Sequence, residues 1–186
     1  RENNAPAALS AAVQETTVIA CAELVGLMGT ALDMTLDYLR TRVQFGKAIG
    51  SFQSLQHRSV DLFIQQQLAS AALADALRAL NEAPDQAQTT ATVSRAKARC
   101  SDAAALVTRQ AIQMHGAIGF TEDSDVGLFV KRALTLAAWL GNINIVPAIT
   151  VYIRHRQTLP STDINTGEHL DPTRPMVLPT VELLSK

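Results

Sequence analysis

The sequence has few aromatic residues, almost no net charge and no long apolar run. Aromatic residues make up 4% of its 186 positions, and the net charge at pH 7 is −1. A nearly neutral chain offers no electrostatic attraction for nucleic acid or for an anionic membrane surface. No uninterrupted apolar run reaches the roughly 20 residues that cross a bilayer, and no signal peptide is visible. We therefore expect a cytoplasmic protein that neither binds nucleic acid nor spans a membrane.

Cysteine is scarce, and histidine is not spaced for metal binding. The two cysteines, Cys21 and Cys100, form no CxxC pair, so we expect two small buried thiols in a reducing compartment. The four histidines show neither HxxxH nor HExxH spacing, which argues against a metal site. The chain begins at Arg1 rather than methionine. We therefore expect that it was processed or is a piece of a longer polypeptide.

The hydrophobic residues, 47% of the chain, recur with helical periodicity. A first helix is predicted over residues 8–41 and a second over 52–80, with Ser51 as its N-cap. The spacing of three and four that defines one apolar face is found in the first helix at Leu24, Leu27, Met28, Ala31, Leu32, Thr35, Leu36 and Leu39. The apolar positions of the second include Leu55, Val60, Phe63, Ile64, Ala71, Leu73 and Leu77.

Two further helices follow. Asp85 starts the third, predicted over residues 86–115, and the fourth opens after Thr121 or Asp123 and reaches about residue 140. Residues 141–144 interrupt the pattern, a further turn resumes near Pro147, and the proline-rich segment from Thr158 is predicted to be an extended or poorly ordered tail. On the third helix we expect a solvated charged face, made of Arg95, Lys97, Arg99 and Asp102.

Long helices with short connections predict an all-α fold, an antiparallel up-down four-helix bundle. We assign residues 1–157 to the bundle and 158–186 to the tail. No strand pair with hairpin chemistry is expected before the tail.

Two glycine-punctuated segments, residues 42–53 (RVQFGKAIGSFQ) and 113–123 (QMHGAIGFTED), end long helices. Arg42 is either a solvated residue that complements the helix dipole or a clamp for phosphate oxygens. Gln53 begins a helix, where free backbone amides favour anions. Gly116 and Gly119 let the chain leave the helix, or they admit a ligand close to the backbone. We expect His115 to bond a carbonyl rather than to titrate.

Both segments resemble the most characteristic segments of the acyl-CoA dehydrogenase C-terminal domain, and the similarity covers about residues 11–156. The resemblance implies a flavoprotein that removes two hydrogens from Cα and Cβ of an acyl-CoA thioester. It also implies a homo- or hetero-oligomer in which each bundle completes an FAD site held mainly by a neighbouring subunit. Arg42 would meet the FAD pyrophosphate, and Gln44, Phe45 and Gln53 would surround the adenosine. Gln113, Gly116 and Ala117 would line the same half of the cofactor.

The catalytic carboxylate of that family has no equivalent here. Its glutamate, commonly in a Tyr-Glu-Gly-Thr segment, aligns with Leu140, which cannot take a proton. Some relatives place the base on the first long helix, where Thr16 aligns and Glu15 lies one residue, or about 100°, away. Glu15 is therefore a weak candidate. Glu23 and Glu122 are expected to be surface or capping carboxylates.

Three hypotheses follow. In the leading one, the chain is the C-terminal part of an acyl-CoA dehydrogenase-like subunit, is inactive alone, and pairs with an active homologue. In the second, the complete enzyme is active with Glu15 or a residue outside this chain as the base. In the third, the bundle is a purely structural oligomerisation domain without flavin contact.

Overall fold

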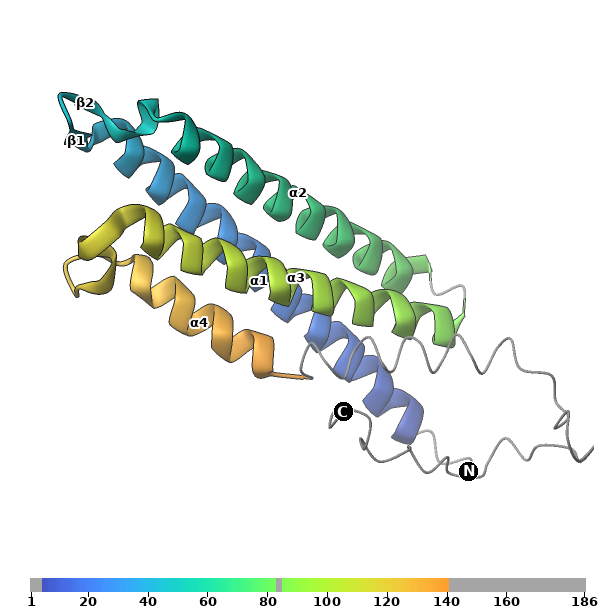
Figure 1. Cartoon of the computed structure of the whole chain (residues 1–186). Coiled ribbons are helices and arrows are strands. Elements are labelled where there is room, and N and C mark those ends of the chain that lie inside the picture. The colour runs from blue at the N-terminus through green and yellow to red at the C-terminus, as the bar shows by residue number, and fades with distance from the viewer. Residues whose placement is uncertain (1–4, 83–84, 141–186) are drawn as a thin grey trace, which may run out of the picture. The chain divides into compact units, whose positions relative to one another are not determined.

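The computed structural model describes residues 5–82 and 85–140, which all belong to one compact unit. Four α-helices form the predicted all-α up-down bundle: α1 (Ala5–Thr41), α2 (Gln53–Glu82), α3 (Gln86–His115) and α4 (Val126–Ala138) (Figure 1). The third helix has the predicted bounds, and the Asp85 side chain caps it by accepting a hydrogen bond from the Gln88 amide at 3.3 Å. The expected turn near Pro147 and the tail from residue 158 lie outside the described residues.

The fourth helix is shorter than expected. It has 13 residues, whereas the other three have 37, 30 and 30. The 3₁₀ helix η2 (Gly116–Phe120) is followed by a turn at residues 121–125, and this turn takes up the first residues of the predicted fourth helix. The predicted four-helix bundle is therefore confirmed, with α4 as its one short helix among the described residues.

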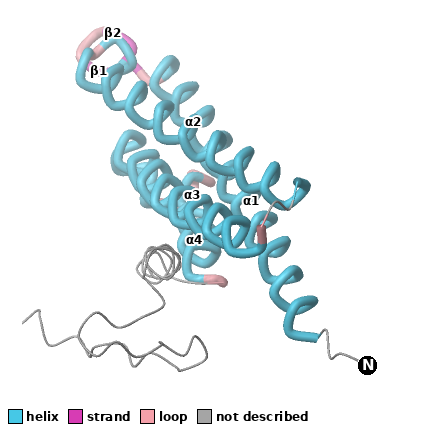
Figure 2. The backbone as a smooth tube through the Cα atoms, turned by 90° about the vertical axis from the view of Figure 1, so that its right-hand side faces the viewer, coloured by secondary structure: helices cyan, strands magenta, loops and turns pink. Residues whose placement is uncertain are grey.

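The core lies along α1 and α3, and α2 and α4 flank this central pair (Figure 2). On α1 the predicted apolar face is confirmed, with Leu27 and Leu36 partly buried at its margin. Both cysteines are fully buried free thiols, as predicted. The fully or nearly fully buried members of the α1 face are Leu24, Met28, Ala31, Leu32, Thr35 and Leu39.

The prediction for α2 was partly wrong. Its buried residues, Leu62, Ala69 and Ala76, recur every seven positions and form a narrow seam. A helix on the flank of a bundle contacts the core along such a seam only, so its other apolar positions remain outside. Five of the seven predicted apolar positions are exposed instead: Val60, Phe63, Ile64, Ala71 and Leu77.

A small β-hairpin connects α1 to α2, contrary to the expectation that no strand pair precedes the tail. Strands β1 (Val43–Gln44) and β2 (Lys47–Ala48) pair in antiparallel register around a two-residue turn. The turn residues Phe45 and Gly46 have φ of 54° and 76°, the two positive values of a type I′ turn. The hairpin escaped prediction because a phenylalanine holds the place where Asn or Asp is typical.

The helix start after this hairpin also differs from expectation. The 3₁₀ helix η1 (Ile49–Ser51) precedes α2, and the Ser51 hydroxyl donates to the Ala48 carbonyl at 2.7 Å. Ser51 therefore closes η1 and is not the N-cap of α2.

The predicted solvated face of α3 is wrong for Lys97. Arg95 and Asp102 are exposed, but Lys97 is 1% exposed, because α4 covers it. The half-buried Arg99 donates a hydrogen bond to the Gln65 side chain of α2.

The helix α1 bears on the prediction that no segment of the chain is apolar enough to cross a membrane. Residues 7–41 within α1 reach a mean hydropathy of 1.5 over 18 residues, which suffices by length and composition to cross a bilayer. The expectation that no segment qualifies was therefore too strict, because it counted uninterrupted runs only. The same helix supplies much of the buried core, and a core helix passes this test as readily as a spanning one.

A matched pair of glycines tests the packing of the bundle. A Cβ at Gly119 would lie 2.7 Å from the Ile112 carbonyl oxygen, so Gly119→Ala is expected to lower the free energy of unfolding by about 1–3 kcal/mol. A Cβ at Gly26 would meet no atom within 4 Å, so Gly26→Ala is expected to raise it by about 0.5–1 kcal/mol. Urea unfolding of both variants measures these changes, and a Gly119→Ala variant as stable as the parent would contradict the packing described.

Candidate functional site

The two glycine-punctuated segments lie at the same end of the bundle (Figure 1). As alternate helices of an up-down bundle, α1 and α3 run in the same direction. The Gln14 side chain donates to the Thr90 hydroxyl at 2.6 Å near the start of both helices. Near their ends, the Tyr38 and His115 rings stack with centroids 4.5 Å apart. The ends of α1 and α3 are therefore held next to each other.

Arg42 is fixed through its backbone and free at its side chain. Its amide donates to the Tyr38 carbonyl at 2.8 Å, and its own carbonyl accepts from the Ile49 amide at 2.8 Å. Its side chain is exposed and makes no hydrogen bond or ion pair with any described residue. A guanidinium on an anchored backbone with no internal partner can offer its fork of donors to an external anion.

The other predicted residues of this segment are exposed as well. The Gln44 side chain donates to the Val43 carbonyl at 2.9 Å, and Gln53 is the first residue of α2. Phe45, at the tip of the hairpin, is 90% exposed, and its ring lies in a T-shaped arrangement with Phe52, with ring centroids 6.1 Å apart. An aromatic ring this exposed presents a flat apolar surface that the chain itself does not cover.

On the α3 side, Gln113, Gly116 and Ala117 are exposed at the helix end. Gly116 has φ 68° and ψ −142°, a combination that is essentially restricted to glycine, and its amide donates to the Gln113 carbonyl. Gly119 is required by its close approach to α3. The turn itself thus explains both glycines, so a ligand is indicated by the exposed side chains and not by the glycines.

His115 behaves as predicted. It is 7% exposed, and its Nδ1–H donates to the Ala111 carbonyl at 2.8 Å. The same ring stacks on Tyr38, so this histidine has a structural role in joining the two segments.

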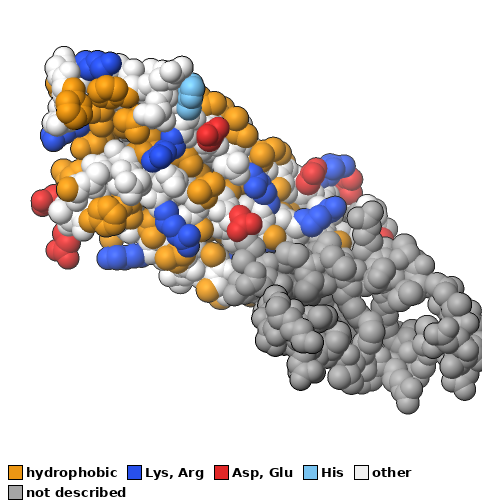
Figure 3. Space-filling model, viewed as in Figure 1, with side chains coloured by type: hydrophobic (Ala, Val, Ile, Leu, Met, Phe, Trp, Pro, Cys, Tyr) orange, Lys and Arg blue, Asp and Glu red, His pale blue; other side chains and the backbone are white. Residues whose placement is uncertain are grey.

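This end of the molecule combines positive charge with apolar surface. The Lys47 ammonium lies 4.3 Å from the centre of the Phe52 ring, and Arg42 is nearby in sequence. Figure 3 shows hydrophobic and basic side chains mixed over this end. Such a surface suits a ligand that carries both anionic oxygens and a flat ring.

The three carboxylates named in the sequence analysis, Glu15, Glu23 and Glu122, lie in different parts of the bundle. Glu15 is exposed on α1, about 40 Å along the helix from Arg42 at 1.5 Å per residue. Glu23 forms a two-point ion pair with Arg132 of α4, at 2.5 Å to Nε and 3.0 Å to Nη2. Hydrogen bonding to the Arg132 guanidinium lowers the pKa of the Glu23 carboxyl below its usual range. Glu122 is exposed in the turn before α4.

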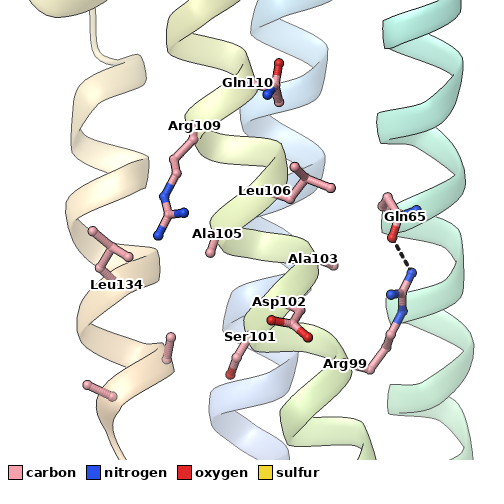
Figure 4. Close-up of a pocket in the computed structure, with 12 residues that line it drawn as sticks. Gln65, Arg99, Ser101, Asp102, Ala103, Ala105, Leu106, Arg109, Gln110 and Leu134 are labelled. Atoms are coloured by element: carbon pink, nitrogen blue, oxygen red, sulfur yellow. Dashed lines mark hydrogen bonds between the residues drawn. The ribbon is translucent and has the colours of Figure 1, made fainter. Parts of the chain in front are cut away.

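A groove of about 700 Å³ on the outer face of α3 was missed in the sequence. It lies between α2 and α4, with Leu106 and Arg109 on its floor and Leu134 of α4 at its side (Figure 4). The Gln110 Oε1 atom, on the turn before Gln113, is buried without a hydrogen-bond partner among the described residues. The signal in the sequence is the i, i+3, i+7 spacing of Arg99, Asp102 and Leu106. Only Arg99 and Asp102 belong to the predicted charged face, and Leu106 extends that face with an apolar side chain.

The four helices define an all-α bundle domain with an exposed polar and aromatic end. The family model of the acyl-CoA dehydrogenase C-terminal domain matches residues 7–151. The chain therefore belongs to the acyl-CoA dehydrogenase family, of which it represents the C-terminal domain.

Individual relatives agree with this assignment. Acyl-CoA dehydrogenase IpdE2 of Mycolicibacterium smegmatis is 38% identical over 126 residues, 67% of this chain and 37% of that protein. Acyl-CoA dehydrogenase FadE34 of Mycobacterium tuberculosis is 36% identical over 125 residues, 67% of this chain and 17% of that protein. The structure of butyryl-CoA dehydrogenase from Megasphaera elsdenii has a TM-score of 0.73 at 26% identity and covers 77% of this chain and 37% of its own. The chain thus spans little more than a third of these relatives at most.

The Glu23–Arg132 pair generates a pH prediction. Because the pKa of Glu23 is lowered in the folded state, the pair stabilises the fold above the unfolded pKa of about 4.3. This stabilisation is lost as the pH falls through the lower, folded-state pKa. Arg132→Met is expected to raise the pKa of Glu23 towards its usual range, as measured by carboxyl ¹³C titration. Arg78→Met, which removes a guanidinium paired with Asp75 on α2, is the matched control. Identical Glu23 titrations in the two variants would refute the assignment.

Proposed function

We propose that this chain is the C-terminal part of an FAD-dependent acyl-CoA dehydrogenase-like protein and supplies the adenosine and pyrophosphate half of an FAD site between subunits. The complete protein would carry out α,β-dehydrogenation of an acyl-CoA thioester, with FAD supplying the redox chemistry. The observation that carries the proposal is the joint exposure of the Arg42 and Gln113 segments at one end of the bundle.

The residues present fit the adenosine half of such a cofactor. The Arg42 guanidinium, without a partner among the described residues, would bind the pyrophosphate by charge-assisted hydrogen bonds. Gln44, Phe45 and Gln53 would surround the adenosine, with the 90% exposed Phe45 ring as its apolar contact. Gln113, Gly116 and Ala117 would approach the same half from α3. All seven are exposed in the single chain, as a site completed by a second subunit requires.

The chain itself would carry no catalytic base. Leu140, at the position of the family glutamate, follows α4 and cannot accept a proton. Glu23 is held by Arg132, and Glu15 remains a weak candidate. We therefore favour a subunit that pairs with an active homologue in a cytoplasmic hetero-oligomer, while a homo-oligomer with a base from outside residues 1–186 is the second possibility. Unaltered turnover after Glu15→Gln in the complete protein would remove Glu15 from consideration.

One observation favours the structural alternative, an oligomerisation bundle without flavin contact. The outer face of α2 exposes a row of large apolar side chains, and such a contiguous surface is typical of protein–protein contact. An interface there is compatible with both functions, so flavin binding has to discriminate between them. The row consists of Val60, Phe63, Ile64 and Leu68, which are 46–56% exposed.

Flavin retention tests the role of Arg42. In the complete, assembled protein, Arg42→Ala is expected to weaken FAD binding about ten- to a hundredfold, because a charge-assisted hydrogen bond contributes about 1.5–3 kcal/mol. Arg40→Ala, two residues earlier and paired with the exposed Asp37, is the matched control and is expected to leave the Kd unchanged. Equal FAD affinity in both variants would favour the structural alternative.

The isolated chain provides a second test. Expressed alone, the 186 residues are expected neither to retain FAD, as judged by absorbance near the flavin bands after gel filtration, nor to oxidise any acyl-CoA. Half of the proposed cofactor site and the base are missing from it. Acyl-CoA oxidation by the isolated chain would overturn the proposal that its partner supplies them.

A further inference from the structure

Lys97 is the largest of the fully buried side chains in the described bundle, and no acidic group neutralises it there. It lies in the middle of α3, with only 1% of its surface exposed. Burial lowers the pKa of its ammonium, and the thiols of Cys21 and Cys100 are close enough to oppose this shift. A lone buried cation is costly unless its donors are all used.

All three donors of the ammonium have acceptors. Nζ donates to the Ser101 hydroxyl at 3.1 Å, to the Leu136 carbonyl at 2.9 Å and to the Ala137 carbonyl at 3.1 Å. An ammonium has three N–H groups, so its capacity is filled. Two of the three bonds reach from α3 to the last turn of α4, and the third stays within α3.

The end of α4 needs such an external donor. The last carbonyls of a helix have no partner inside it, and a glycine just after the helix commonly helps to satisfy them. Here Trp139 is extended, with its amide donating to the Thr135 carbonyl at 3.1 Å, and the next residue is Leu140 with φ 58°. A positive φ at a leucine is strained by about 1–3 kcal/mol, and it persists only where surrounding contacts impose it.

We propose that Lys97 is a positioning residue that clamps the last turn of α4 and thereby fixes the backbone at Leu140. That Leu140 faces the acyl group rests on the proposed function, in which Leu140 occupies the place of the family's catalytic glutamate. Lys97 and Gln113 both belong to α3, about 24 Å apart along the helix at 1.5 Å per residue. One rigid helix therefore sets the distance between the adenosine-binding end and the acyl-facing backbone, even in a chain that lacks the base.

Hydrogen exchange at the Trp139 amide tests this clamp in the full chain. Trp139 is the only tryptophan, and its amide closes the last turn of α4. Lys97→Met is expected to speed exchange of this amide about ten- to a hundredfold, because the carbonyls of Leu136 and Ala137 lose their donor and the turn opens locally. Acrylamide is expected to quench the fluorescence of Trp139 more strongly in the variant, because the indole becomes more accessible.

Three controls separate the clamp from a general loss of stability. Arg95→Met removes an exposed charge from the preceding turn of α3, and Ser101→Ala removes the one bond that does not reach α4. Leu62→Ala destabilises the core from α2. None of the three is expected to change Trp139 exchange under native conditions. If Lys97→Met does not fold, Lys97→Gln, which keeps N–H donors without the charge, is expected to give an intermediate rate.

Unchanged Trp139 exchange in the Lys97 variants, or equal acceleration by Leu62→Ala, would overturn the proposal. The measurement needs no flavin and no partner. If the proposed FAD site is refuted, the hydrogen-exchange result still tests the clamp. If the clamp is refuted, the Arg42→Ala measurement still tests the FAD site.

Discussion

The parallel packing of α1 on α3 is the constraint on which the rest of the structure depends. The pairs Gln14–Thr90 and Tyr38–His115 join the two helices at opposite ends with nearly the same sequence offset, so their register is constant. Because both helices run in the same direction, the two segments that follow them emerge side by side. A shift by one helical turn, about 5.4 Å, would break the Tyr38–His115 stack and displace the two segments relative to each other.

At the end of the bundle where these two segments lie, the backbone is held by hydrogen bonds and the side chains of the proposed site are exposed. Backbone bonds from Tyr38 and Ile49 hold Arg42, and the turn at Gly116 closes on α3, while the side chains of the seven proposed site residues are exposed. Elsewhere the bundle buries even a charged group, Lys97, to complete the end of α4. A buried lysine with every donor satisfied thus contrasts with an exposed arginine whose side chain has no acceptor among the described residues.

The sequence predicted the long helices well because their signals are periodic and local. Gln86–His115 has the expected bounds, since Asp85 and Gly116 mark both of its ends. The hairpin around Phe45, the exposure of Phe63 and the burial of Lys97 were not predicted, because each depends on which helix covers a position. For the site, the sequence identified segments whose residues turn out to be exposed and adjacent. The proposed binding would involve a second subunit, and no local pattern in one chain describes such a contact.

Protection of arginine side chains from chemical modification tests the central claim most directly. The complete, assembled protein is labelled with phenylglyoxal with and without bound FAD, and the modified arginines are quantified by mass spectrometry. Our account predicts that FAD protects Arg42 while Arg40, two residues away and equally solvent-facing, is labelled alike in both states. Equal labelling of Arg42 with and without FAD would contradict the account.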